Sequence, residues 1–213
     1  MKTEDLITLL ATGVEPVERH AVARRYAVAL GFGVIGAAAL MVKLLGVRPD
    51  LAEAARLPMF WVKLVFVASL AWASLAVTAR LARPGVRLAW VPAALLAPVL
   101  AIWGLGGLAL ADADPLERSG LIYGATWASC PWLIAMLSAP ILIAAFWAMR
   151  GLAPTRPGLA GSASGLLAGS VGALVYCLHC PELGAPFLGT WYLIGMLIPA
   201  GLGGLLGARL LRW

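Results

Sequence analysis

Six long apolar runs, separated by short polar breaks, fill most of the chain. The runs are Tyr26–Val47, Met59–Ala79, Ala89–Ala111, Pro131–Met149, Leu159–Leu178 and Leu188–Ala208. Each has roughly the 20 residues that a helix needs to cross a bilayer. The breaks carry charge or proline, and none is long enough to hold a soluble domain. The pattern therefore predicts an all-α fold, with six transmembrane helices and short loops forming one polytopic membrane domain over residues 26–213.

Composition supports a membrane protein over a soluble one. The chain is 62% hydrophobic and 12% charged, whereas soluble proteins run at about 45–50% and 25%. Its mean hydropathy is +0.92. The net charge of +6 comes from arginines at the ends of the apolar runs, which is typical of membrane topology. We therefore expect the lipid bilayer as the surroundings and no direct contact with nucleic acid.

The basic residues are divided unequally between the two sides of the predicted bundle. The side that holds both termini carries eleven of the sixteen: Lys2, Arg19, Arg24, Arg25, Arg80, Arg83, Arg87, Arg150, Arg156, Arg209 and Arg212. The other side carries Arg48, Arg56 and Arg118, and the remaining two, Lys43 and Lys63, lie inside apolar runs. The positive-inside rule then predicts that both termini are cytoplasmic. The expected location is the bacterial inner (plasma) membrane.

The break after the fifth run gathers chemistry that the rest of the chain lacks. It reads "CLHCPE", residues 177–182, and it is predicted to face the outside, where disulfides can persist. The short loop Gly151–Gly158 makes the fourth and fifth runs antiparallel neighbours. That brings the start of the fourth run level with this break. We therefore expect the three thiols and the imidazole to share one depth: Cys130, Cys177, Cys180 and His179.

The thiols differ in their expected reactivity. Cys130 precedes Pro131 at the start of a predicted helix, where the helix dipole favours the thiolate. Cys177 and Cys180 fall at the end of a helix, where the dipole opposes it. This polarity is the reverse of a thioredoxin-type CxxC. Three interpretations stay open at this point, namely inert apolar side chains, a redox pair, or a soft-metal site, since thiolate with imidazole suits Zn, Cd or Cu(I).

Two lysines lie about one helical turn below the predicted outer surface. Lys43 and Lys63 flank the first outer loop. One interpretation is that both side chains extend to the interface. The other is that Lys63 faces the bundle interior and stabilises a thiolate or an anion.

The first 25 residues form the only sizeable polar segment on the cytoplasmic side. Thr3, followed by Glu4 and Asp5, is typical of a helix start, and apolar residues follow it. A helix this short needs a surface to be stable, and the acidic residues disfavour anionic lipid. We therefore expect residues 1–25 to bind a protein partner, through Thr3, Asp5, Leu6, Ile7, Leu9 and Leu10.

Several motifs resemble the NrsF/OsrA family of six-helix membrane anti-sigma factors. They are "MKTEDLITLLATG", "LGVRPDL", "LPMFWVKL", "WASCP", "RGLAPTRPGLAG", "HCPE" and "APFLGTWY", and the resemblance extends over essentially the whole chain. It implies a cytoplasmic N-terminus that holds an extracytoplasmic-function (ECF) sigma factor. It also implies sensing of metal or oxidative stress by Cys130 and Cys180, with Cys177 as an extra thiol. In the metal interpretation the ligands would be Cys130, Cys180 and His179, and no other cofactor is required.

We expect Cys130 to be the reactive thiol and Cys180 its partner. Gly161, Gly165 and Gly169 predict close helix packing, which we expect to couple the fourth and fifth runs. Two other classes of protein stay open. A membrane thiol oxidoreductase would need a catalytic CxxC, and a small metal transporter would need polar residues in mid-membrane. Apart from small hydroxyl side chains, the centres of the runs hold almost no polar residues. The sequence also has neither a Walker motif nor an HExxH motif, either of which would indicate an enzyme.

Overall fold

The computed structural model describes residues 3–12, 21–82, 89–152 and 154–211, and all the regular secondary structure in them is helical. The side chains at positions 9, 10, 21 and 22 lie outside this description. The elements in chain order are α1 (Thr3–Ala11), α2 (Ala21–Leu40), the π-helical turn η1 (Met41–Leu45), α3 (Leu51–Ala54), α4 (Pro58–Leu81), α5 (Val91–Asp112), α6 (Arg118–Tyr123), α7 (Cys130–Arg150), α8 (Pro157–Tyr176), α9 (Ala185–Phe187), the π-helical turn η2 (Leu188–Tyr192) and α10 (Leu193–Leu210).

Six stretches within the described residues are long and apolar enough to cross a membrane. They are Ala23–Leu45, Pro58–Leu81, Val91–Asp112, Cys130–Arg150, Pro157–Tyr176 and Ala185–Leu210. Each coincides with one of the six apolar runs to within a few residues. Five of the helices have proline in the first turn, where the missing N–H costs nothing, namely α4, α5, α7, α8 and α9. The predicted all-α fold with six membrane-length helices is confirmed.

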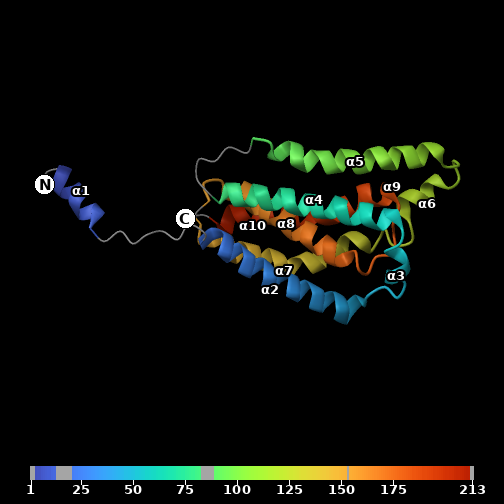
Figure 1. Ribbon diagram of the computed structural model, residues 1–213, viewed down its shortest axis with the longest axis horizontal. Coiled ribbons are helices and arrows are strands. Elements are labelled where there is room, and N and C mark those ends of the chain that lie inside the picture. Colours follow the sequence, from blue (N-terminus) through green and yellow to red (C-terminus); the bar gives the residue numbers. More distant parts are fainter. Residues whose placement is uncertain (1–2, 13–20, 83–88, 153, 212–213) are drawn as a thin grey trace.

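Helix α8 is the centre of the bundle. It packs against α10, α7 and α4. In its most apolar stretch 67% of the residues are buried inside the protein, compared with 11% in that of α5. In Figure 1, α5 and α2 lie at opposite edges of the bundle, with α4, α8, α7 and α10 between them. The small residues of α8 permit this central position, because they let these three helices approach its backbone.

The three glycines Gly161, Gly165 and Gly169 of α8 pack against α10, not against α7. A Cβ atom on Gly161 would overlap the carbonyl oxygen of Gly203, and one on Gly165 would overlap that of Pro199. A Cβ atom on Gly169 would lie 2.7 Å from the carbonyl oxygen of Met196. The prediction of close packing is confirmed, but the expected partner, the fourth run, was wrong. A stripe of small residues permits a close approach without selecting which neighbour makes it.

The two ends of the bundle differ in structure. Figure 1 shows the short helices α3, α6 and α9 gathered at one end, with the start of α2 and the end of α10 at the other. We call the first the thiol end, because Cys130, Cys177 and Cys180 belong to elements that meet there. Five of the basic residues predicted to lie at the other end are outside the described residues, namely Lys2, Arg19, Arg83, Arg87 and Arg212.

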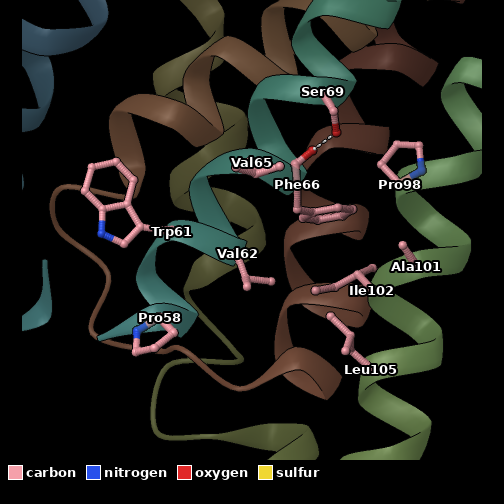
Figure 2. A pocket seen from close by; sticks show the side chains of 10 residues that line it. All are labelled: Pro58, Trp61, Val62, Val65, Phe66, Ser69, Pro98, Ala101, Ile102 and Leu105. Atoms are coloured by element: carbon pink, nitrogen blue, oxygen red, sulfur yellow. Dashed lines mark hydrogen bonds between the residues drawn. The ribbon is translucent and has the colours of Figure 1, made fainter. Parts of the chain in front are cut away.

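A cavity of about 320 Å³ separates the peripheral helix α5 from α4. Figure 2 shows its ten lining residues, which are apolar except for Ser69. The Ser69 hydroxyl donates to the carbonyl oxygen of Phe66 at 2.7 Å. The one polar side chain that the lining contains is therefore already paired. The cavity is what a loosely packed edge helix leaves on the lipid-facing side of a bundle.

Candidate functional site: a buried thiol and lysine cluster

The turn that follows α8 places two cysteines inside the thiol end. Backbone hydrogen bonds from His179 and Cys180 to the carbonyl oxygen of Tyr176 tighten the last turn of the helix, and Pro181 then prevents its continuation. Cys177 and Cys180 are both 0% exposed. This tight end of a helix, rather than an open loop, fixes the direction of the two sulfur atoms.

The third cysteine reaches the same place from another helix. Cys130 is the first residue of α7 and is 0% exposed. Its backbone N–H donates to the carbonyl oxygen of Thr126 at 2.9 Å. All three cysteines are free thiols and belong to one hydrophobic core. The prediction that they come together at one end of the bundle is confirmed.

Within the cluster, Cys180 carries the thiolate character. The Cys130 thiol and the backbone N–H of Glu182 both interact with the Cys180 sulfur. These interactions, first that with Cys130, together with the positive charge of Lys63, hold the pKa of Cys180 well below its usual range despite burial. Burial instead raises the pKa of Cys177 to about 11.

This arrangement favours the opposite assignment to the one expected from the sequence. We expected Cys130 to be the thiolate, because it lies at the start of a helix. In the structure it is the pKa of Cys180 that is lowered, and which thiol of the pair is the reactive one stays a prediction. The local hydrogen bonds and the nearby ammonium group outweigh the half charge of the helix end.

Lys63 is fully buried beside the thiols. Its side chain is 0% exposed, and its ammonium group donates to the carbonyl oxygens of Cys180 and Glu182, both at 3.0 Å. The Nζ atom also lies 5.0 Å from the centre of the Tyr192 ring. The prediction that Lys63 faces the interior is confirmed, and extension to the interface is wrong for this residue. Lys43, by contrast, is exposed.

A second cation binds the same turn. The Arg48 guanidinium donates to the carbonyl oxygen of Cys180 at 3.2 Å and makes a bidentate ion pair with Asp50, at 2.8 and 2.7 Å. This pair raises the pKa of Arg48 and lowers the pKa of Asp50. Because the last carbonyl groups of a helix lack partners and carry partial negative charge, two cations are well placed there. Sequence reasoning assigned no role to Arg48, although the "RPD" motif was a signal.

Glu182 joins this turn to the loop before α7. Its carboxylate accepts from the backbone N–H of Ala125 at 2.8 Å and from the Thr126 hydroxyl at 3.4 Å. The carboxylate also lies where a Cβ atom on Gly124 would be, at 2.7 Å, and Gly124 has a φ of 55°. Only glycine meets both conditions without strain. The two segments that carry Cys130 and Cys180 are therefore tied together outside the sulfur atoms.

Two tyrosines enclose the sulfur atoms from the bundle side. Tyr176 and Tyr192 are 1% and 0% exposed, and their rings lie 5.8 Å apart. Tyr176 interacts with both Cys130 and Cys180. The Tyr192 hydroxyl lies next to Cys177 and Cys180. It nevertheless makes no hydrogen bond of acceptable geometry within the described part of the chain. Sequence reasoning missed Tyr176, since an aromatic residue in an apolar run carries no signal of its orientation.

His179 does not point toward the thiols. Its Nδ1 atom lies 2.9 Å from the carbonyl oxygen of Gly46, and its ring packs 5.7 Å from that of Tyr176. In the described ranges no group of three or more His, Cys, Asp and Glu side chains is arranged to hold a metal ion. The expected ligand set of Cys130, Cys180 and His179 is therefore not assembled in this structure.

The predicted partner-binding segment is partly described. Helix α1 (Thr3–Ala11) has Glu4 and Asp5 in its first turn, and Leu6 and Ile7 are 42% and 60% exposed. The side chains of Leu9 and Leu10 and the stretch 13–20 lie outside the described residues. An apolar pair in water at the start of the chain fits the expected surface-seeking helix, and its partner stays a prediction.

Fold and site together define the class: a six-helix protein of multi-pass membrane architecture with a buried, cation-stabilised thiol cluster at one end. The family model described as "NrsF: Negative regulator of sigma F" matches residues 10–213. The chain is 60% identical over 213 residues to the "Probable anti-sigma-F factor NrsF" of Azospira oryzae, and 41% identical over 215 residues to the "Anti-sigma-F factor NrsF" of Caulobacter vibrioides. Both matches cover 100% of each chain. No solved structure matches. The chain belongs to the NrsF family of negative regulators of sigma F.

Proposed function

We propose that this chain is an inner-membrane anti-sigma factor that sequesters an ECF sigma factor through residues 1–25 and releases it when Cys130 and Cys180 sense oxidative or metal stress. Family membership supports the regulatory role. The proposed topology puts both termini in the cytoplasm and the thiol end outside, which fits the excess of arginine at the other end.

The partner-binding half of the proposal is supported by helix α1. Its exposed Leu6 and Ile7 offer an apolar contact, and the acidic first turn offers charge to a basic partner. Deleting residues 2–12 should release the sigma factor and turn its target genes on permanently. The double variant Leu6→Asp, Ile7→Asp should do the same, whereas Thr8→Ala should keep repression, because the Thr8 hydroxyl is bonded within α1 to the Glu4 carbonyl oxygen. Unchanged repression after the deletion would rule this out.

The observation that carries the sensing half is the buried, interacting pair of free thiols, Cys130 and Cys180, that two separate segments bring together. With Cys180 as the thiolate and Cys130 as the thiol, loss of two electrons to an oxidant and of one proton from Cys130 would form one disulfide. That bond would shorten the sulfur contact and remove the thiolate charge beside Lys63. The start of α7 would then move relative to the turn after α8. The fixed contact of α8 with α10 would transmit the shift along the bundle.

The size of the required effect is modest. Changing the free sigma factor from about 1% to about 99% takes roughly 5.5 kcal/mol of differential affinity, and a partial response takes less. The decisive experiment compares induction in cells that carry single serine variants. Cys130→Ser and Cys180→Ser should keep repression and lose induction by oxidant. Cys177→Ser should respond like the wild type, because this thiol is buried and its pKa is raised. A normal response in the Cys130→Ser, Cys180→Ser double variant would disprove thiol sensing while leaving the anti-sigma role intact.

A further inference from the structure

A continuous groove follows α2 and α7 at the end opposite the thiols. Its larger part, about 430 Å³, is lined by apolar residues of both helices, including Phe32, Pro140 and Ile143. A second part, about 360 Å³, is lined by Arg24, Arg25, Val28 and Trp147. Because Val28 and Trp147 line both parts, the two form one groove with a basic mouth and an apolar body.

The basic mouth is held in place by the wall of the groove. The Arg25 guanidinium lies over the Trp147 ring, 4.7 Å from its centre, and donates to the Trp147 carbonyl oxygen at 3.0 Å. Arg24 is exposed one residue earlier on α2. An arginine stacked on an indole keeps its charge and loses little side-chain freedom. The mouth therefore presents two positive charges, one of them fixed in position.

The apolar body follows from the close contact of the two helices below it. A Cβ atom on Gly33 would lie 2.8 Å from the Cα atom of Ile141, so the backbones nearly touch at this point. Phe32 and Ile143, 70% and 71% exposed, stand on either side. From Arg24 to Gly33 a helix rises about 14 Å, which is enough for a substantial part of an acyl chain.

We propose that this groove binds one anionic phospholipid, with the phosphate at Arg24 and Arg25 and an acyl chain along α2 and α7. The groove opens on membrane-length helices, so the molecule that meets it is a lipid. Two positive charges at its mouth select a net negative headgroup, because a zwitterionic headgroup brings a second cation to the same place. Each basic residue near a membrane surface attracts anionic lipid by about 1 kcal/mol, or roughly fivefold in affinity. This inference does not depend on the proposed function.

Native mass spectrometry of the full-length protein in detergent tests the site, with phosphatidylglycerol and phosphatidylcholine of identical acyl chains as probes. The wild type should retain phosphatidylglycerol in preference to phosphatidylcholine. Arg24→Gln should weaken phosphatidylglycerol binding about fivefold, and Arg24→Gln with Arg25→Gln should weaken it further. Arg25→Lys should keep the preference, since the charge is kept.

Two further variants separate this site from a general basic surface. Arg209→Gln removes an exposed charge near the end of α10 and should leave the preference unchanged. Val28→Trp fills the junction of the two parts while both arginines remain, and it should weaken binding of phosphatidylglycerol. Equal retention of the two lipids by the wild type, an equal loss in Arg209→Gln, or full binding by Val28→Trp would each overturn the proposal. Thermal unfolding identifies any variant that fails to fold, and Arg24→Gln alone then decides the outcome.

Discussion

Replacing Lys63 by methionine tests whether the buried ammonium group organises the thiol cluster. Methionine keeps an unbranched apolar stem and removes the charge. The substitution takes away two hydrogen bonds, to the carbonyl oxygens of Cys180 and Glu182 at 3.0 Å each. It also takes away the cation beside the Tyr192 ring. Everything else about the position stays buried and apolar.

The expected loss of stability follows from which groups remain unpaired. Two hydrogen bonds from a charged donor contribute up to about 3–6 kcal/mol, but burying the ammonium group costs several kcal/mol, which methionine avoids. The carbonyl oxygen of Cys180 keeps its bond from Arg48 at 3.2 Å. The carbonyl oxygen of Glu182 loses its Lys63 donor, and a buried unpaired acceptor costs about 1–3 kcal/mol. We therefore expect Lys63→Met to lower the free energy of unfolding by about that amount.

The assay pairs unfolding in detergent with titration of the thiols by far-ultraviolet thiolate absorbance. In Lys63→Met the pKa of Cys180 should move up toward its ordinary value, because the positive charge that helps to lower it is gone. Lys43→Met is the matched control, since Lys43 is exposed and such a change alters stability by no more than about 0.5 kcal/mol. Wild-type stability together with an unchanged thiol titration in Lys63→Met would refute the reasoning.

Three further predictions address packing, pH and topology. Gly165→Ala should destabilise the bundle by about 1–3 kcal/mol, because its Cβ atom would meet the backbone of Pro199. Gly201→Ala, whose Cβ atom meets nothing within 4 Å, should stabilise α10 by about 0.5–1 kcal/mol, and thermal unfolding compares the two. Since the pKa of Cys180 is lowered on folding, its thiolate adds stability above the ordinary thiol pKa of about 8.5 and loses it as pH falls toward the folded pKa. The difference in stability between the wild type and Cys180→Ser should accordingly widen between about pH 6 and pH 9, and a constant difference would contradict the assignment of the thiolate to Cys180. Reporter fusions after Trp213 and near Pro115 should give cytoplasmic and periplasmic signals respectively, and matching signals would overturn the topology.

The number and extent of the membrane-length helices could be predicted from the sequence, because the length of an apolar run is itself the physical requirement. The convergence of Cys130 on Cys180 could also be predicted, since a short loop forces α7 and α8 to be antiparallel. Neither prediction depends on how a helix is rotated about its own axis. Both therefore held.

Rotation and local hydrogen bonding set the limit of the sequence-based prediction. Whether Lys63 faces lipid or interior depends on the rotation of α4, and the apolar residues around it give no strong amphipathic pattern. The glycines of α8 were assigned the wrong neighbour for a similar reason. The direction of His179 depends on the backbone carbonyl group of Gly46, and the lowered pKa of Cys180 depends first on the neighbouring Cys130 side chain. No spacing rule indicates those contacts.

The central claim is that the Cys130–Cys180 pair controls release of a sigma factor bound at the N-terminal segment. Its most direct test is sigma-factor retention by full-length protein reconstituted in lipid nanodiscs, before and after treatment with a thiol-specific oxidant. The account predicts that oxidant releases the sigma factor from the wild type and from Cys177→Ser. It also predicts that the Cys130→Ser, Cys180→Ser double variant keeps its sigma factor under the same treatment. Equal release from that double variant and from the wild type would contradict the account.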